Sequence, residues 1–342
     1  MTATSSKTSH SGTHHADGAH EPPAVARAAG IIFAVTALLA ILAIAFALPA
    51  TRSGPHNVPI GAAGPQAAGQ GIADRLEQKM PGAFAVTYYP GEAALSEAIR
   101  NRDVYGGIAF PGKPGDQPAL LIATGGSPMV AQILTQVGTE LSRQTGMPLR
   151  TQDLAPPTAR DPRGAGLAAS ALPITLAGIV PAIALMLALR TQVWTRLGAA
   201  VVFSGVAGIT IAVLLRYVLG SIEQNFWGVT AGLTLGVAAA LLTMLGLGSL
   251  FGRAGLGAGA ALALLVGNPL SGLASAPELL PGGWGQLGQL LPQGATATLL
   301  RSTAAFGGAG ASTAVTVLTC WALAGTAMVV VAALRRRKTA PE

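Results

Sequence analysis

Long apolar runs without charged residues, separated by short polar connections, make up most of this chain. An α-helix rises 1.5 Å per residue, so about 20 apolar residues cross the ~30 Å hydrocarbon core of a bilayer. Six runs approach or reach that length, and we interpret each as a transmembrane helix. They cover residues 31–49, 171–189, 198–219, 228–249, about 254–270 and 313–334.

The first of these runs could also belong to a cleaved signal peptide. The apolar region of such a peptide usually has about 7–15 residues and follows a short basic start. The run at 31–49 is longer and follows the polar residues 1–30. We therefore expect an uncleaved anchor. The preceding tail, 1–30, is predicted to be disordered because it has few large apolar residues to bury.

Residues 51–170 carry a mixed pattern that is typical of a soluble domain. Short apolar, β-rich runs at 58–63, 84–89, 105–110 and 118–124 alternate with helical patterns at 66–80, 92–102 and 128–145. This alternation predicts a small α/β sheet, followed by a linker at 154–166. The predicted fold is thus an α-helical polytopic membrane protein of six transmembrane helices, with this α/β domain between helices 1 and 2. Residues 171–334 form its five-helix membrane domain.

Composition and charge support the membrane class and set its orientation. The chain is 51% hydrophobic and 10% charged, against about 25% charged residues in soluble domains. Part of the net charge of +7 gathers in the connections 190–196 and 251–253 and in the basic tail 335–342, whereas 220–226 has no basic residue. The positive-inside rule then places both termini in the cytoplasm and the α/β domain outside. The excess of basic residues is explained by the membrane topology and does not indicate a surface that binds polyanions. We therefore predict no nucleic-acid partner.

The stretch 277–305 is too broken by Gly and Pro to span, yet it carries a helical apolar face. Pro281 interrupts this face early, and Pro292 ends it. We predict two short re-entrant or interfacial helices that dip into the outer leaflet, with Trp284 at the interface and Arg301 at the water. The face itself comprises Leu279, Leu280, Trp284, Leu287, Leu290 and Leu291.

The sequence offers no catalytic, cofactor or metal motif. Residues 107–114 (GIAFPGKP) approach a phosphate-binding loop, but Pro114 stands where Ser or Thr must hold magnesium. The single cysteine, Cys320, is expected to be a small buried hydrophobe. Four histidines cluster in the N-terminal tail, where we expect a solvated segment, a weak metal site being the alternative. They are His10, His14, His15 and His20.

A few charged residues near the membrane are candidates for a polar path or gate. Arg216 either snorkels to the outer interface beside Tyr217 or lines a path, paired with Glu223. Glu278 follows a proline and fits the first turn of a helix, where an acid faces the positive end of the dipole. Asp161 and Arg163 mark the junction between domain and membrane. The candidate path or gate residues are Arg216, Glu223, Glu278, Trp284, Pro281 and Pro292.

At the level of layout, the chain resembles the permeases of type-2 ABC exporters. More narrowly, it is similar to short bacterial membrane proteins related to the phage-infection-protein (YhgE/Pip) group. The resemblance rests on DPRG (161–164), GNPLSGLASAPELLPGGWGQLGQLLPQGA (267–295) and LLRSTAAFGG (299–308). It implies a bacterial plasma-membrane protein, a homodimer or paired subunit, a separate cytoplasmic ATPase, and outward movement of a hydrophobic or amphipathic substrate.

The sequence leaves two function classes open. The first is a permease-like subunit of an export system, which has no ATPase motif of its own. The alternative is a non-transporting envelope protein whose outer α/β domain binds a ligand or partner while the spans anchor it in the lipid bilayer.

Overall fold

The structure is a computed structural model that describes residues 23–112, 117–273 and 275–339. The chain divides into two compact units, residues 1–43 and 44–342. Helix α1 (Ala24–Thr51) begins in the first unit, before the predicted start at residue 31. Residues 24–30 are therefore helical rather than disordered. The rest of the predicted tail, with its histidines, lies outside the described residues.

Five helical elements in the described part of the chain are long and apolar enough to cross a membrane. This finding is consistent with a multi-pass helical membrane protein. The elements are Ala24–Pro49, Ala165–Ala188, Val193–Val218, Phe226–Gly267 and Ser312–Arg336.

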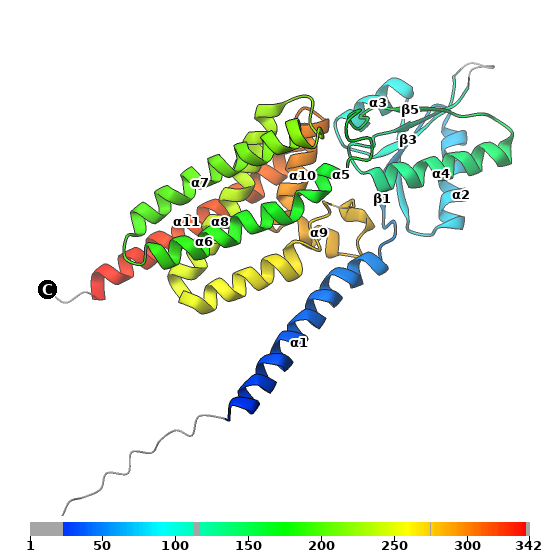
Figure 1. The fold of residues 1–342 in the computed structure, drawn as a ribbon. Coiled ribbons are helices and arrows are strands. Elements are labelled where there is room, and N and C mark those ends of the chain that lie inside the picture. The colour runs from blue at the N-terminus through cyan, green and yellow to red at the C-terminus, as the bar shows by residue number, and fades with distance from the viewer. Residues whose placement is uncertain (1–22, 113–116, 274, 340–342) are drawn as a thin grey trace, which may run out of the picture. The chain divides into compact units, whose positions relative to one another are not determined.

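The predicted fourth and fifth spans lie in one helical element that is broken at Gly252. This glycine has φ 63° and ψ −139°, a conformation that residues with a Cβ rarely adopt. Beyond it the chain turns back, so that Leu256 packs on Gly248 and Met244 packs on Gly259. Figure 1 shows the second half of α8 in yellow, folded back beside the first. The element consists of α8 (Phe226–Leu262) and a π-helical end, η2 (Ala263–Gly267).

The first half of α8 is the centre of the helical bundle. It lies among α6, α7, α10 and α11 (Figure 1). Glycines four residues apart allow this close packing: Gly232 faces Leu299, and Gly236 faces Thr296. The surrounding elements are α5 (Ala165–Ala169), α6 (Ala171–Ala188), α7 (Val193–Val213), η1 (Leu214–Val218), η3 (Pro277–Leu279), α9 (Trp284–Gln289), α10 (Pro292–Ala305) and α11 (Ser312–Thr339).

Helix α11 differs from two details of the prediction. It continues through Arg335 and Arg336, which the sequence pattern assigns to a separate tail. Cys320 lies on an exposed face of α11, so the prediction that it is buried was wrong. An apolar run does not reveal which of its faces packs inward when nearly every position is apolar.

The small α/β sheet predicted for residues 51–170 is present, and it is a mixed sheet with strand order β2-β1-β3-β4-β5. Strands β1 and β2, β1 and β3, and β4 and β5 pair in parallel, whereas β3 and β4 are antiparallel. The last strand was not predicted, because its sequence RTQD has no apolar residue. The elements are β1 (Val58–Ala63), α2 (Gln66–Lys79), β2 (Phe84–Tyr89), α3 (Glu92–Arg100), β3 (Gly106–Ala109), β4 (Ala119–Ile122), α4 (Pro128–Thr145) and β5 (Arg150–Asp153).

Helices cover both faces of this sheet. On one face, Ile72 of α2 and Leu134 of α4 pack with Ile108. On the other face, Leu95 and Ile99 of α3 form a second core. Because both faces are buried, the central strands are apolar throughout rather than alternating.

Candidate functional site

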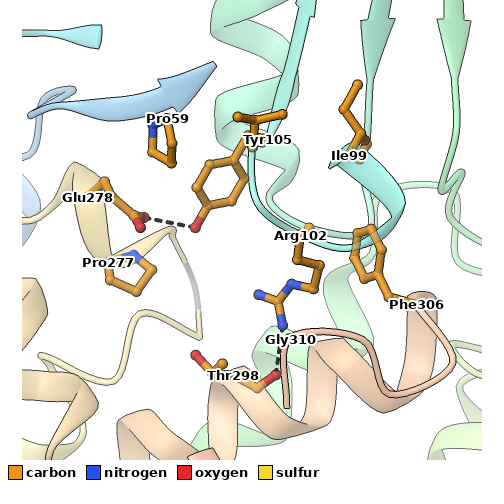
Figure 2. A pocket seen from close by; sticks show the side chains of 12 residues that line it. Pro59, Ile99, Arg102, Tyr105, Pro277, Glu278, Thr298, Phe306 and Gly310 are labelled. Atoms are coloured by element: carbon orange, nitrogen blue, oxygen red, sulfur yellow. Dashed lines mark hydrogen bonds between the residues drawn. The ribbon is translucent and has the colours of Figure 1, made fainter. Parts of the chain in front are cut away.

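A cavity of about 190 Å³ lies where the α/β domain meets the segment before α11. The domain contributes Arg102 and Tyr105 to its lining, and the later segment contributes Glu278, Thr298 and Phe306. Figure 2 shows these side chains converging from both parts of the chain. None of the five shares a local motif with the others, so the sequence pointed only to Glu278.

Arg102 lies just after α3 in a left-handed backbone conformation, with φ 65°. Its Nη1 donates to the carbonyl of Thr298 at 3.1 Å and to the hydroxyl of Ser302. The guanidinium also lies 5.4 Å from the ring centre of Phe306, a cation–π contact. Burial lowers the pKa of Arg102, but a guanidinium stays charged at neutral pH. This side chain thus ties the domain to α10.

Tyr105 and Glu278 form the second tie. The phenol donates a 2.8 Å hydrogen bond to the carboxylate of Glu278 (Figure 2). Burial, together with the charge and hydrogen bond of Glu278, raises the pKa of Tyr105 well above its usual value. The phenol therefore stays protonated and donates. Glu278 does occupy the first turn of a short helix, η3, after Pro277, as the sequence predicts.

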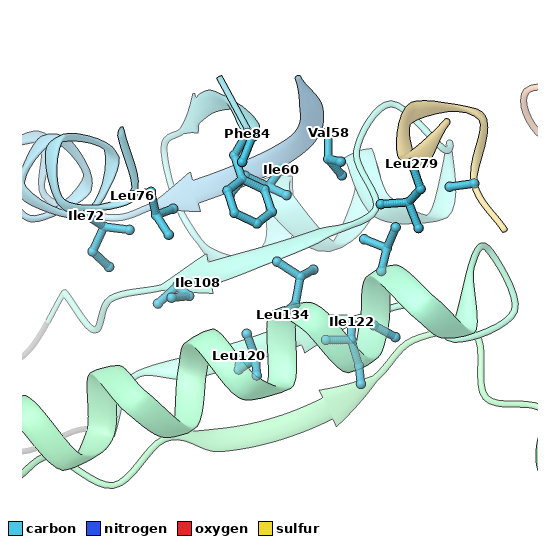
Figure 3. Close-up of a cluster of buried hydrophobic side chains, with 14 residues drawn as sticks. Val58, Ile60, Ile72, Leu76, Phe84, Ile108, Leu120, Ile122, Leu134 and Leu279 are labelled. Carbon is cyan, nitrogen blue, oxygen red and sulfur yellow. The ribbon is translucent and has the colours of Figure 1, made fainter. Parts of the chain in front are cut away.

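Leu279, which follows Glu278, belongs to the core of the α/β domain. It is 2% exposed and packs in the same cluster as Val58 and Ile122. Figure 3 shows Leu279 entering this cluster from the segment beside the sheet. We expected this leucine to dip into the outer leaflet with the rest of its face. The structure instead uses it as a core residue of the neighbouring domain.

Only α9 and the residue after it, Leu290, keep the exposed apolar face that the sequence predicted for the whole stretch. Trp284 is 36%, Leu287 50% and Leu290 60% exposed. Gly288 lies against the carbonyl of Leu270 and leaves no room for a Cβ, which fixes the packed side of this short helix. The carbonyl of Pro281 accepts the backbone N–H of Trp284 at the start of the turn into α9.

Helix α10 lies inside the bundle. Pro292 occupies its first position and is buried. Arg301 is 4% exposed, so the prediction that it lies at the water was wrong. Its guanidinium donates to the carbonyl of Leu273 at 2.7 Å and to that of Gly272. Backbone carbonyls of a distant loop satisfy this charge, and a local pattern cannot reveal such partners.

Asp161 joins the linker to the bundle. Its carboxylate accepts the backbone N–H groups of Ala165 and Gly166, each at 2.9 Å, and the hydroxyl of Ser221 at 2.6 Å. Burial favours a higher pKa, but these hydrogen bonds outweigh it and lower the pKa of Asp161. Arg163 is exposed. Asp161 thus caps α5 and ties the linker to Ser221 in the loop before α8.

Arg216 lies in the π-helical end of α7, with its guanidinium 5.7 Å from the ring centres of both Tyr217 and Phe226. Glu223 is exposed. Within the described residues, the guanidinium of Arg216 therefore lies against aromatic rings and not against the carboxylate of Glu223.

A second cavity, of about 290 Å³, lies in the bundle between α6, both halves of α8, α10 and α11. Its walls are mainly apolar, and include Ile179, Met244, Leu262, Trp321 and Met328. Three polar side chains also reach it: Thr175, Thr243 and Gln293. An apolar cavity with a few polar groups is typical of sites for hydrophobic small molecules.

Arg196 is a further residue whose position the sequence did not predict. The sequence pattern assigns it to the basic connection 190–196, but it lies in the first turns of α7 and is 1% exposed. Among the described residues, no group of three or more His, Cys, Asp or Glu could hold a metal ion. Lys113 and Pro114 of the near-miss phosphate loop lie outside the described residues.

Comparison of the chain with protein-family models gives no match. Comparison with curated protein sequences and with solved structures gives none either. The function therefore has to be inferred from the geometry of the chain itself.

Proposed function

We propose that the chain is a permease-like membrane subunit that exports a hydrophobic or amphipathic molecule. The observation that carries this proposal is the apolar cavity of about 290 Å³ in the bundle, which four helices surround. Its volume and lining suit an apolar group with one or two hydrogen-bonding atoms. The resemblance to type-2 ABC exporter permeases supports the same function.

In the proposed topology the chain crosses the bacterial plasma membrane six times. The two halves of α8 would then be antiparallel crossings joined at Gly252, which the contact between Met244 and Gly259 supports. Both termini would be cytoplasmic and the α/β domain outside. The second half is short for a full span, and η2 with the residues up to Leu270 would complete it.

Labelling of single cysteines tests this topology in a Cys320→Ser background. Arg143→Cys lies on an exposed side chain of the α/β domain, and Gln192→Cys lies in the exposed α6–α7 connection. In intact cells an impermeant maleimide should label position 143 and leave position 192 unlabelled until the cells are opened. The opposite pattern would overturn the proposed orientation.

The proposed mechanism couples the α/β domain to the bundle through the segment 276–302. Leu279 is held in the domain core, while Arg102 holds α10, which lines the cavity through its N-terminal end. A shift of α10 would therefore move the domain with it. A second subunit and a separate ATPase would supply the driving force, as the resemblance implies.

Export can be tested without knowing the substrate. Deleting the gene in its own bacterium should increase the accumulation of, and sensitivity to, some members of a panel of amphipathic dyes and detergents. A tagged chain extracted in detergent should co-purify an ATPase. If no compound is affected and no ATPase associates, the export proposal fails.

A variant pair links export to the cavity. Ala240 lines the cavity, and Ala240→Leu should fill part of it and reduce efflux. Ala231 lies on the same helix but is exposed, so Ala231→Leu adds the same volume outside the cavity. Equal loss of efflux in both variants at equal expression would count against the cavity as the substrate site.

The alternative function is ligand binding by the α/β domain. A mainly apolar groove of about 250 Å³ between α2 and α4 favours it. Leu76, Met80 and Val137 line this groove, and Arg75 and Lys79 lie at it. Under this alternative, Val137→Trp would abolish function, whereas Ala240→Leu would leave it unchanged.

A further inference from the structure

Arg196 is a buried cation whose hydrogen-bonding capacity is largely unused. Its side chain is 1% exposed, and Nη2 donates to the hydroxyl of Ser249 at 2.8 Å. Nε and Nη1 are buried and have no hydrogen-bond partner among the described residues. Buried polar atoms in proteins are nearly always partnered, and a buried charge without a counter-charge is unusual. The free donors therefore point to a group that the described residues do not supply.

No acidic residue of the described bundle can supply the counter-charge. Between residues 171 and 336 the acids are Glu223 and Glu278. Glu223 lies in the connection at the opposite end of α7, and Glu278 accepts the phenol of Tyr105.

Further positive charge gathers at the same end of the bundle. The Nη1 of Arg336 donates to the carbonyl of Arg190, which brings the end of α11 to the α6–α7 connection. Arg253 directly follows the break at Gly252, close to Ser249 in the chain. Figure 1 shows these helix ends together. Arg196 is the fourth residue of a candidate span, which is the depth of lipid headgroups.

We propose that the guanidinium of Arg196 binds a phosphate group with Nε as a donor, and that this phosphate belongs to an anionic phospholipid. The planar guanidinium forms strong charge-assisted hydrogen bonds with phosphate oxygens. Basic pockets between membrane helices on the cytoplasmic side bind lipid headgroups in this way. Entry requires the side chains that cover the guanidinium to move aside. The proposal depends on membrane insertion but not on transport.

The experiment measures binding and thermal unfolding of the full chain in nanodiscs. Phosphatidylcholine alone is compared with phosphatidylcholine containing phosphatidylglycerol, and with phosphatidylcholine plus inorganic phosphate. Phosphatidylglycerol should raise the melting temperature of the wild type. Arg196→Met should weaken phosphatidylglycerol binding by ~10-fold or more, because the specific donors are lost. Arg253→Gln, which removes an exposed charge, should weaken it by no more than ~5-fold.

Arg196→Met is expected to fold, so a loss of lipid binding in this variant can be attributed to the missing guanidinium. Arg196→Met removes an unpaired buried charge, so its melting temperature in phosphatidylcholine should equal or exceed that of the wild type. Arg196→Lys keeps the charge and should retain part of the lipid effect. Native mass spectrometry of the wild type should show a retained phosphatidylglycerol that Arg196→Met lacks.

Three results would overturn the proposal. If Arg196→Met and Arg253→Gln lost phosphatidylglycerol binding equally, the lipid would be held by general attraction to the positive surface rather than by Arg196. Full stabilisation by inorganic phosphate in phosphatidylcholine would make the site one for free phosphate rather than lipid.

Glu342, outside the described residues, is the remaining acid after residue 170 apart from Glu223 and Glu278. If Glu342→Gln destabilised the wild type but not Arg196→Met, an internal carboxylate would be the partner.

Discussion

The phenol of Tyr105 lies 2.8 Å from a carboxylate oxygen of Glu278, although 173 positions separate the two residues in the chain. One belongs to the α/β domain, and the other belongs to the segment between the last two long helices. Together with the bonds from Arg102 to α10, this contact fixes the domain against the bundle. Single substitutions at these contacts can test how each of them holds the fold.

Loss of the Tyr105–Glu278 bond should destabilise the protein. Tyr105→Phe should lower the free energy of unfolding by about 1–2 kcal/mol. A double-mutant cycle with Glu278→Ala should give a coupling energy of about 1–3 kcal/mol, since the acceptor is charged. Tyr88→Phe, at an exposed tyrosine, serves as the control. Denaturant unfolding in detergent measures all four variants, and zero coupling would refute the tie.

Tyr105 should also make stability depend on alkaline pH. Its pKa is raised in the folded state, mainly by burial, above the ordinary value of about 10. Above pH ~10 the unfolded phenol loses its proton while the folded one keeps it, so stability falls as pH rises. Tyr105→Phe should lose less stability over this range than the wild type. Parallel melting curves at neutral and alkaline pH measure the difference.

Asp161 should make stability depend on acidic pH in the opposite sense. Burial raises its pKa, but hydrogen bonds from Ser221, Gly166 and Ala165 outweigh that effect and lower it. The stabilisation is therefore present above pH ~4 and is lost as pH falls through the folded pKa. Asp161→Asn should melt lower than the wild type at neutral pH and approach it in acid. Exposed Asp74→Asn should show no such convergence.

The break at Gly252 should tolerate no side chain. Gly252→Ala forces a Cβ into φ 63°, ψ −139°, and should cost about 1–3 kcal/mol. Gly257 lies in the second half of α8, without a positive φ and with open space where a methyl group would lie. Gly257→Ala should therefore be neutral or stabilise by up to ~1 kcal/mol. Thermal unfolding compares the two. Equal tolerance would mean that the two halves do not form a hairpin at this residue.

Leu279 should behave as a core residue of the α/β domain. Leu279→Ala leaves a cavity beside Val58 and Ile122, and should cost about 2–5 kcal/mol. Leu287→Ala removes the same atoms from a side chain that is 50% exposed, and should change the unfolding free energy by less than ~1 kcal/mol. Limited proteolysis within the domain provides a second readout. Rapid cleavage is expected for Leu279→Ala alone.

Local sequence patterns were enough to predict the apolar helical runs and the boundaries of β1, β2 and α4. These features depend on local periodicity and hydrophobic length, which neighbouring residues carry. The start of α4 depends on Ser127, whose side chain accepts the backbone N–H of Val130, and on Pro128 at the first helical position. Only part of the candidate site could be predicted from the sequence. Glu278 and Asp161 stood out because charges are rare near apolar runs, but their partners Tyr105 and Ser221 did not.

The positions of Leu279, Arg301 and Arg196 depend on tertiary packing. Each sits in a stretch whose pattern fits more than one environment: an apolar leucine suits lipid or a core, and an arginine near a helix end suits water or burial. The choice depends on groups far along the chain, namely the sheet that meets Leu279, the carbonyl of Leu273 and the hydroxyl of Ser249. Such contacts form because long-range packing brings these groups together, and no local spacing encodes them.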